Sequence, residues 1–474
     1  MIPFDLTPDH RRQLFDELLP QLEAYYTHTR DRRVAPELDP QRVRDIVGGF
    51  DFSKPVPAGE AVDFVVNSLL EHQVHVPHPM YYGLYNPRTN FPSILADLIA
   101  AYFNPQLAAW SHSPFAAEVE SYLVREYGKR FGYDGATVDG TFTSGGAEAN
   151  LTGVLCAINH RFADYANRGY KAFDAEPVVY CSDQAHHSVV KAARVAGLGL
   201  DSVMQIPTDE GLRMSVPALT DRLASDVEAG RVPVMVIATA GTTGTASIDD
   251  LPAIADLCEH YGIWLHVDAA FGGAAVLNEA YRHWLRGIDR ADSITTDIHK
   301  WLSVPMGTGM FLTRHPTILD RTFRTTAEYM PREGSSLSIV DPYTHTIQWS
   351  RRFLGLRMYL SLLVFGWEGY AKTIRHHVEM GDYLRDRLSA HGWTIENDTP
   401  LPVVCFSRTG GSSDYGTEAR AICQRVVDSG EAWLSVYPVR GVDVLRAGIT
   451  NYATTREDID RLVELLSRLR DDAD

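Results

Sequence analysis

Short apolar runs alternate with helical stretches through the middle of the chain, between about residues 140 and 314. The runs are rich in β-branched residues and read TFTS, PVVYCS, SVMQIP, PVMVIATA, IWLHVDAA, SITTDI and GMFLTR. Strands that alternate with helices indicate βαβ units, in which successive strands lie parallel. We therefore predict an α/β fold built on a mostly parallel sheet, with the polar strand ends at one edge.

Helical patterns flank this region on both sides. Apolar residues recur at helical spacing in residues 7–29, behind the start signal Thr-Pro-Asp, and they are Leu14, Leu18, Leu19, Leu22 and Tyr25. This amphipathic helix either folds back on its own domain or forms a subunit interface. After Ser350 a long helical stretch leads to three strand-like runs, LPVVCFSR, LSVYPV and VLRAGI. A closing helix, TTREDIDRLVELLSRLR, follows with Thr454 or Thr455 as its cap.

Composition narrows the class of partner. The 474 residues carry a formal charge of −17, which argues against nucleic acid or an anionic membrane as a partner. The five cysteines are odd in number and widely spaced, which is typical of buried thiols in a reducing cytosol, and they show no zinc-ligand spacing. No signal peptide or membrane-spanning run is evident, so a cytoplasmic location is expected.

The run TFTS leads into a glycine turn, FTSGGAEANLTGVLCAINHRF, that is followed by a helical pattern. Gly145 and Gly146 allow the backbone to approach an anion closely, and the first turn of a helix offers unpaired N–H groups. A phosphate suits such a site. The motif is neither a Walker A loop nor GxGxxG, and a tight turn without a ligand has the same pattern.

Two other runs end in charged residues. HVDAA places Asp268 at the end of a buried strand, where a carboxylate requires a cationic partner such as a pyridinium nitrogen or an arginine. Lys300 follows the next strand, in TDIHKW, and the residues after it are apolar. We therefore expect desolvation to lower the pKa of Lys300 and make its amine nucleophilic. The alternative is a solvated surface lysine.

Histidines accompany these features. His299 precedes Lys300 and can hydrogen-bond a phosphate. His186 and His187 lie in the loop after PVVYCS, where one imidazole can stack on a flat cofactor ring or both can be solvated. Each motif alone is ambiguous. The order and spacing of the four motifs (the glycine turn, the loop after PVVYCS, HVDAA and TDIHKW) are more specific than any one of them.

Together these motifs resemble the group II pyridoxal-phosphate decarboxylases, the family of aromatic L-amino acid, histidine and glutamate decarboxylases. The resemblance extends from HPMYYGLYNP near residue 78 to LRAGITNYATTREDID near residue 460. It implies pyridoxal 5'-phosphate (PLP) as the cofactor and the aspartate aminotransferase-like fold (fold type I) with a seven-stranded sheet. It also implies an N-terminal helical, dimer-forming segment at 1–90, a PLP-binding large domain at 91–365 and a small C-terminal α+β domain at 366–474.

The resemblance assigns roles to individual residues. Lys300 would carry PLP as a Schiff base, and Asp268 would hold the pyridine nitrogen. His186 would stack on one face of the ring and Ala270 would lie against the other, while His187 has no assigned role. The other cofactor contacts would come from Gly145, Gly146, Ala147, His299, Asp297 and Ser293 around the phosphate, and from Thr243 beside the 3-oxygen or the substrate carboxylate.

The chain departs from the family pattern in the phosphate site. Gly146 and Ala147 stand where many members have Ser or Thr, so backbone amides would supply more of the contacts. Asp297 occupies the position of a frequent Asn. A carboxylate beside a phosphate would be repelled unless it is protonated or turned away.

Residues 329–350 match the mobile catalytic loop of the family, and their polar middle suits a lid. Tyr343 aligns with the tyrosine that protonates the α-carbon after carbon dioxide leaves, with His186 as an alternative donor. Members with Phe there tend to make aldehydes, so Tyr343 favours simple decarboxylation to an amine, unless it is only a surface aromatic. Aldehyde synthesis, transamination and a non-enzymatic scaffold remain alternatives.

Two segments, HPMYYGLYNPRTNF and NPQLAAWSHSP, resemble the substrate-pocket strips of the family, and the second would reach in from a partner subunit. Substrate contacts would come from Tyr85, Asn86, Pro87 and Ala108. Arg446 is either a carboxylate contact or a structural arginine. The apolar strip favours an aromatic or bulky apolar L-amino acid, while Arg88 and Asn86 leave acidic and diamino acids open. The resemblance also implies a homodimer in which the N-terminal helix is exchanged.

Overall fold

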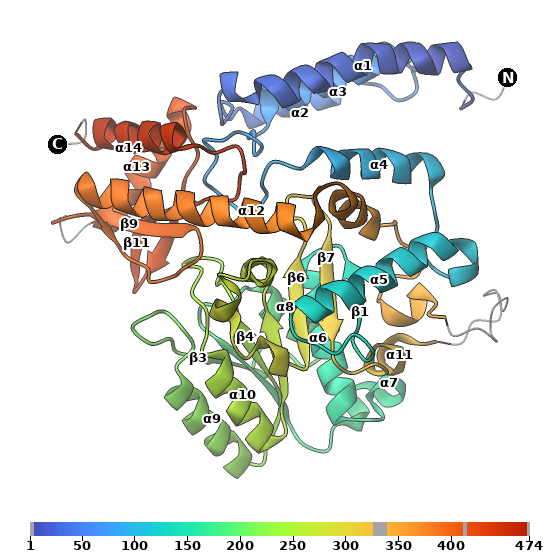
Figure 1. The fold of residues 1–474 in the computed structure, drawn as a ribbon, viewed down its shortest axis with the longest axis vertical. Coiled ribbons are helices and arrows are strands. Elements are labelled where there is room, and N and C mark those ends of the chain that lie inside the picture. The colour runs from blue at the N-terminus through green and yellow to red at the C-terminus, as the bar shows by residue number, and fades with distance from the viewer. Residues whose placement is uncertain (1–3, 326–338, 411–414, 472–474) are drawn as a thin grey trace.

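A seven-stranded sheet forms the centre of the molecule (Figure 1), in a computed structural model that describes residues 4–325, 339–410 and 415–471. The strand order is β1-β7-β6-β5-β4-β2-β3, and only the pairings of β7 with β1 and β6 are antiparallel. The predicted α/β fold with a mostly parallel sheet is confirmed. Its strands are β1 (Asp139–Thr143), β2 (Pro177–Ser182), β3 (Val203–Ile206), β4 (Val232–Thr239), β5 (Trp264–Asp268), β6 (Ser293–Asp297) and β7 (Gly309–Thr313).

Helices cover both faces of this sheet, which explains why its strands are apolar on both sides. In β2, Val178 and Tyr180 join one core cluster, whereas Val179 and Cys181 join the other. The first face is covered by α5 (Pro114–Arg130), α9 (Val216–Glu228) and α10 (Leu251–Tyr261). The second is covered by α6 (Gly146–Arg161), α8 (Ser188–Val195) and α11 (Ile318–Phe323), with α7 (Tyr165–Arg168) beside them. All five cysteines are free and four are buried.

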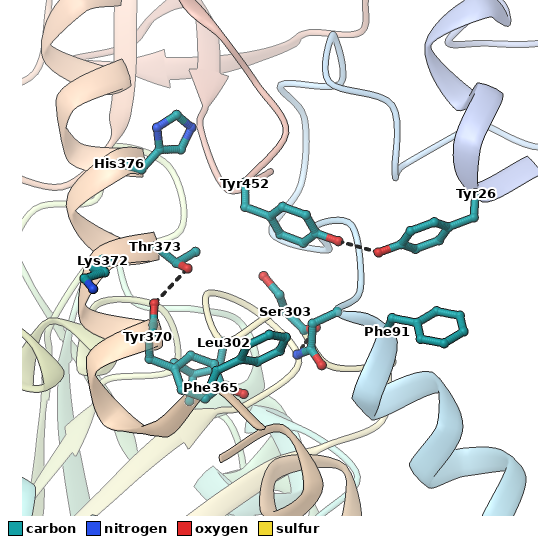
Figure 2. Close-up of a pocket in the computed structure, with 12 residues that line it drawn as sticks. Tyr26, Phe91, Leu302, Ser303, Phe365, Tyr370, Lys372, Thr373, His376 and Tyr452 are labelled. Carbon is teal, nitrogen blue, oxygen red and sulfur yellow. Dashed lines mark hydrogen bonds between the residues drawn. The ribbon is translucent and has the colours of Figure 1, made fainter. Parts of the chain in front are cut away.

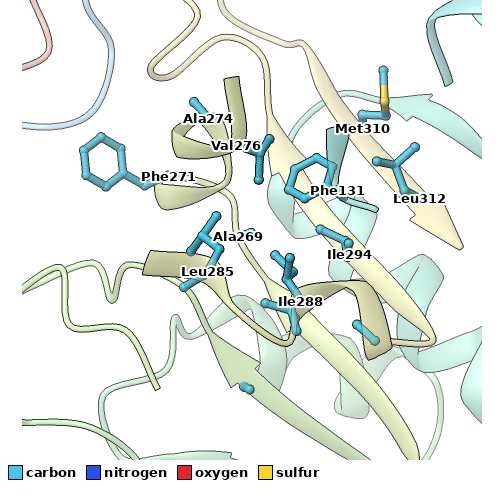
Figure 3. Packing of buried hydrophobic residues seen from close by; sticks show 14 of the residues in the cluster. Phe131, Ala269, Phe271, Ala274, Val276, Leu285, Ile288, Ile294, Met310 and Leu312 are labelled. Atoms are coloured by element: carbon cyan, nitrogen blue, oxygen red, sulfur yellow. The ribbon is translucent and has the colours of Figure 1, made fainter. Parts of the chain in front are cut away.

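The chain that follows β5 is fixed by packing. The turn η4 (Gly272–Leu277) is buried throughout and packs in the same core cluster as Phe131, Ile294 and Leu312 (Figure 3). The strand before it is buried throughout as well. Because close-packed side chains hold the backbone on both sides of Asp268, the carboxylate at the strand end has a fixed position.

The C-terminal region forms a second, antiparallel sheet with the order β10-β11-β9-β8. The predicted strands and closing helix are confirmed, whereas β8 is too short to have been recognised. Thr455 caps the closing helix: its hydroxyl accepts from Asp458 N, and the Asp458 carboxylate accepts from Thr455 N. The elements are α12 (Gly355–Ala390), which is broken at Gly366, β8 (Trp393–Ile395), β9 (Val403–Arg408), α13 (Tyr415–Ser429), β10 (Ser435–Val439), β11 (Val442–Gly448) and α14 (Arg456–Asp471).

The N-terminal helices form a layer at one end of the molecule (Figure 1). The predicted first helix is confirmed as α1 (Pro8–His28), with the Thr7 hydroxyl accepting from His10 N. None of its residues is buried. The layer also holds α2 (Pro40–Gly48) and α3 (Ala58–His72), and α4 (Phe91–Phe103) lies beneath it. Among the helices within the described ranges, none has the length and apolarity needed to cross a bilayer.

Three buried histidines make the stability of this fold depend on pH. Burial lowers the pKa of His78 and His266 to about 4 and that of His377 to about 3, from an ordinary value of 6.5. All three are therefore neutral in the folded chain at neutral pH. Below the ordinary value the unfolded chain binds more protons than the folded chain, so stability is lost as the pH falls toward these lowered values.

We expect the free energy of unfolding of the cofactor-free protein to fall by roughly 1 kcal/mol per buried histidine between about pH 7.5 and about pH 5.5. Urea titration at several pH values measures this change. His377→Gln, which keeps an acceptor for Trp301 Nε1, should remove one histidine's share. The exposed His10→Gln should remove none. An unchanged pH dependence in His377→Gln would contradict the assignment.

Candidate active site

A cavity of about 260 Å³ opens where β1, β4, β5 and β6 end. It brings together Tyr85 and every predicted cofactor residue except Ser293. Its lining consists of Tyr85, Gly145, Gly146, Ala147, Asn150, His186, Ser188, Thr239, Gly241, Thr243, Asp268, Ala270, Phe271, Asp297, His299 and Lys300. No group of three or more metal-ligating side chains occurs among the residues that the structure describes.

The glycine turn forms one end of the cavity. Gly145 has a φ of +152°, which disfavours any residue with a side chain, and no side chain caps the N-terminus of α6 that follows. A Cβ atom at Gly146 would lie 3.1 Å from Asp297 Oδ2 and 3.4 Å from Ala270 Cβ. Glycine therefore keeps the backbone close to the cavity, and the helix dipole and free amides there favour an anion such as a phosphate.

Asp268, at the end of β5, also lines the cavity and is almost fully buried. Its Oδ2 accepts from Asn150 Nδ2 at 2.8 Å, and its Oδ1 accepts from Ala270 N at 3.1 Å. Within the described residues, no lysine, arginine or histidine forms an ion pair with it. A buried carboxylate that faces a cavity without a cationic partner suits the protonated ring nitrogen of a pyridine.

The amine of Lys300 forms an ion pair with a carboxylate, whereas the sequence predicted an apolar environment. Its Nζ lies 3.1 Å from Asp297 Oδ2, and 23% of its side chain is exposed. Burial alone would lower the pKa of Lys300, but Asp297 and Asp268 together raise it above the ordinary value. The predicted lowering of this pKa is therefore wrong, because the sequence argument counted desolvation and omitted the two carboxylates. The amine must lose a proton before it can act as a nucleophile.

Asp297 and His299 lie beside the lysine. Asp297 Oδ1 is buried without a hydrogen-bond partner, and its Oδ2 lies 3.8 Å from His299 Nε2. The His299 ring is positioned through Nδ1, which lies 2.9 Å from the Thr308 carbonyl oxygen. Burial lowers the pKa of His299, so this imidazole is neutral at neutral pH. The pairing with Lys300 explains how a carboxylate is accommodated at a position where an amide is frequent.

His186 has a defined tautomer. Its Nδ1 accepts a hydrogen bond from Ser188 N at 3.2 Å and lies 2.8 Å from Ser188 Oγ. Because a backbone N–H can only donate, Nδ1 carries no proton and Nε2 does. Burial also lowers the pKa of His186. The ring is therefore a neutral imidazole whose Nε2–H is free for an acceptor in the cavity.

Ser293 does not belong to the phosphate site, and that prediction is wrong. Its side chain is fully buried, its hydroxyl accepts from Trp264 Nε1 at 2.8 Å, and it lies 2.7 Å from His266 Nδ1. Ser293 starts β6 and Asp297 ends it, so at a rise of about 3.3 Å per residue the two are about 13 Å apart. Only the carboxyl end of the strand reaches the cavity.

The predicted substrate residues are dispersed. Tyr85 lines the cavity and donates to the Thr243 carbonyl oxygen at 3.0 Å, whereas Asn86 accepts from Tyr81 Oη and, like Pro87, is not part of the lining. Arg446 is buried and donates to the carbonyl oxygens of Gly244 and Gly83. Its Nη2 has no partner, and its guanidinium lies 4.9 Å from the centre of the Tyr85 ring.

Tyr343 and Ala108 lie together outside the cavity lining of their own chain. Tyr343 N donates to the Ala108 carbonyl oxygen at 3.0 Å, and its ring packs against Trp349 at 4.9 Å between centroids. Both residues are buried. Positions 329–338 of the predicted catalytic loop lie outside the described residues.

Sequence reasoning missed five lining residues: Asn150, Ser188, Thr239, Gly241 and Phe271. Two of them had a usable signal. Asn150 lies one helical turn after Gly146 and therefore on the same face of α6. Ser188 is the last residue of the Ala-His-x-Ser match that identified His186. The remaining three depend on how the loops after β4 and β5 pack, which no local pattern reveals.

Comparisons with known proteins identify the family of this chain. The family model described as the pyridoxal-dependent decarboxylase conserved domain matches residues 59–409. The chain is 29% identical to an aromatic-L-amino-acid decarboxylase of Bacillus atrophaeus over 98% of this chain and 97% of the relative. It is 30% identical to a histidine decarboxylase of Drosophila melanogaster over 94% of this chain and 54% of that longer protein.

A crystal structure of Oryza sativa TDC with PLP and tryptamine has a TM-score of 0.93 to this chain at 23% identity. The alignment covers 100% of this chain and 99% of that one. This likeness confirms the predicted fold class, and the family match confirms the resemblance inferred from the motifs and PLP as the cofactor. The cavity fits that cofactor because it presents an amine, an unpaired carboxylate and a free helix N-terminus.

We expect Asp297→Asn to lower the pKa of Lys300, because the substitution removes the closest negative charge. The rate of PLP uptake depends on the unprotonated amine, so its pH midpoint should fall by about 1 unit or more. Stopped-flow absorbance of cofactor-free protein mixed with PLP measures this rate. Asp183→Asn, which neutralises an exposed carboxylate at the same sheet edge, is the control and should leave the midpoint unchanged. An unshifted or higher midpoint in Asp297→Asn would count against the ion pair.

Proposed function

We propose that this chain, which belongs to the pyridoxal-dependent decarboxylase family, acts on an aromatic or bulky apolar L-amino acid. The reaction is the PLP-dependent conversion of an L-amino acid to the corresponding amine and carbon dioxide. The substrate class rests on the cavity wall beside Lys300, where the ring centroids of Tyr85 and Phe271 lie 4.1 Å apart. An apolar side chain gains free energy when it leaves water for such a wall.

The aromatic wall is itself rigidly supported. Phe271 stacks on Trp301 with 5.0 Å between ring centroids, and Trp301 Nε1 donates to His377 Nδ1 at 2.8 Å. The hydroxyl of Tyr85 is held by the Thr243 carbonyl oxygen. Because these rings are already ordered, binding a substrate side chain costs little conformational entropy. The similarity to an aromatic-L-amino-acid decarboxylase over 98% of the chain supports the same class.

Separate parts of the cavity would hold the cofactor. Lys300 would bind it covalently through its amine, Asp268 would hold its ring nitrogen, and His186 and Ala270 would enclose the ring. When bound, PLP supplies a protonated ring that accepts the electron pair left by departing carbon dioxide. The phosphate would be bound by the backbone amides of Gly145, Gly146 and Ala147, with His299 beside them and Thr243 nearer the substrate.

Proton transfer would involve side chains from two places. His186, a neutral imidazole with its proton on Nε2, would donate a hydrogen bond from that N–H and would have to regain any proton it gave up from another group. Tyr343, which with Ala108 lies outside the cavity of its own chain, would reach the cavity of a partner subunit and protonate the α-carbon. Arg446 would offer its unpaired Nη2 to a carboxylate beside Tyr85. A lid that closes over the site would exclude water during these steps.

Exposed apolar side chains favour a homodimer as the functional unit. On α4 and the break in α12, the exposed residues include Leu98, Ile99, Tyr102, Phe103, Leu363 and Val364. A cavity of about 500 Å³ opens nearby between α12 and the start of α4, with the hydrogen-bonded pair Tyr26 and Tyr452 at its rim (Figure 2). Surface of this kind usually marks an interface. We infer that a second copy covers it with its N-terminal helices.

The substrate class is tested by carbon dioxide release from the common L-amino acids. We expect release from aromatic or bulky apolar substrates, with one amine formed for each carbon dioxide. Lys300→Ala should abolish turnover, and borohydride reduction followed by peptide mapping should find the cofactor on Lys300 in the unmodified sequence only. Release from acidic or diamino acids alone would contradict the substrate class. Ammonia and peroxide among the products would instead indicate aldehyde synthesis.

The dimer is tested by sedimentation. Phe103 is 82% exposed on α4, so Phe103→Glu should weaken association by placing a charge in the interface. Turnover should fall with the dimer fraction as the protein is diluted. Tyr170→Glu changes an aromatic residue of similar exposure on η3 (Gly169–Ala172), away from α4, and should have no effect. A fully active monomer would disprove the shared site.

A further inference from the structure

We infer that Asn150 is a positioning residue that couples the carboxylate of Asp268 to the imidazole of His186. The residue is 1% exposed, lies on the first turns of α6 and forms part of the cavity lining. The amide nitrogen donates to Asp268 Oδ2 at 2.8 Å and to Ser188 Oγ at 2.9 Å. Both N–H groups of the amide are therefore used, one for the Asp268 carboxylate and one for Ser188, which in turn contacts His186. The inference rests on the proposed function for the roles of Asp268 and His186 at the cofactor.

The orientation of this amide is set from behind by His266. His266 Nε2 lies 3.1 Å from Asn150 Oδ1, and its Nδ1 lies 2.7 Å from Ser293 Oγ. Ser293 accepts from Trp264 Nε1, so its own hydroxyl hydrogen is available for Nδ1. Because an amide oxygen can only accept, the contact with Asn150 Oδ1 places the His266 proton on Nε2, which also lies 3.1 Å from Thr295 Oγ1. A flipped amide would place its oxygen against the Asp268 carboxylate, which is unfavourable, so the nitrogen faces the site.

Asn150 is connected to His186 through the hydroxyl of Ser188. Ser188 Oγ accepts from Asn150, which leaves its hydroxyl hydrogen for His186 Nδ1, 2.8 Å away. Together with the backbone N–H of the same serine, this bond keeps the His186 proton on Nε2. A single amide thus stabilises the negative charge that faces the ring nitrogen and the tautomer of the imidazole that faces the ring. A leucine would fill the same space and do neither.

The test compares Asn150→Leu with a control on the same helix. Asn159 is also buried, and its amide donates only to the Leu155 carbonyl oxygen, so Asn159→Leu removes a buried amide away from the site. The readouts are the dissociation constant for PLP, from fluorescence titration of cofactor-free protein, and the thermal midpoint. We expect about a tenfold or larger rise in the dissociation constant for Asn150→Leu. Asn159→Leu should bind PLP as the unmodified protein does, with a similar loss of thermal stability.

A double-mutant cycle separates positioning from packing. His266→Phe should raise the dissociation constant several-fold in the unmodified background and much less in Asn150→Leu, because the inferred effect of the histidine on PLP binding passes through the amide. Additive effects, or an unchanged dissociation constant in Asn150→Leu, would overturn the inference. Failure of the proposed function is a different result: the unmodified protein would bind PLP, with the predicted ranking of variants, and release no carbon dioxide.

Discussion

The site depends on burying an amine and two carboxylates together. Lys300 compensates the charge of Asp297, and Asp268 is stabilised by hydrogen bonds from Asn150 Nδ2 and Ala270 N. A buried charge without partners is strongly unfavourable, so each of these contacts is needed for the fold as well as for chemistry. One negative charge remains without a cation among the described residues. A protonated pyridine ring would supply the missing positive charge, and by mass action its binding would then stabilise the folded chain.

The parallel sheet makes this arrangement possible. Asp268 ends β5, and it is paired in register with Thr239 of β4 and Thr295 of β6. Asp297 ends β6 two residues further along, so both carboxylates point into the same edge of the sheet. The N-terminus of α6 opens at that edge, and its unpaired amides would balance the charge of a phosphate. The positive and negative parts of the site are therefore produced by strand ends and one helix end, without a dedicated binding loop.

The sequence predicted the sheet, the glycine turn, Asp268 and Lys300 from local patterns, whereas other cavity residues such as Ala147, Thr243 and Ala270 were implied by the family resemblance. β-branched runs specify strands, and Gly145 marks a turn that few other residues can form. The errors arise where the three-dimensional arrangement decides. The pKa of Lys300 is raised mainly by Asp297, three residues earlier, and also by Asp268 from another strand, and only the folded chain shows that both carboxylates lie near the amine. Ser293 was assigned to the cavity without regard to its distance from the strand end. Asn150 was missed because its importance lies in its partners.

The distribution of unsatisfied polar atoms separates supporting groups from those that bind ligands. Asn150, in the cavity wall, forms hydrogen bonds through both N–H groups and its oxygen, and His266 next to it forms hydrogen bonds through both ring nitrogens. A buried network of this kind is favourable only when every member is satisfied, and it then fixes one arrangement. By contrast, two buried atoms have no hydrogen-bond partner among the described residues: Oδ1 of Asp297, which lines the cavity, and Nη2 of Arg446, whose guanidinium lies next to the Tyr85 ring. Leaving such atoms unpaired is costly in a folded chain. The complete network therefore fixes Asp268 and His186, whereas Asp297 and Arg446 each keep one buried polar atom whose hydrogen-bonding capacity is unused among the described residues.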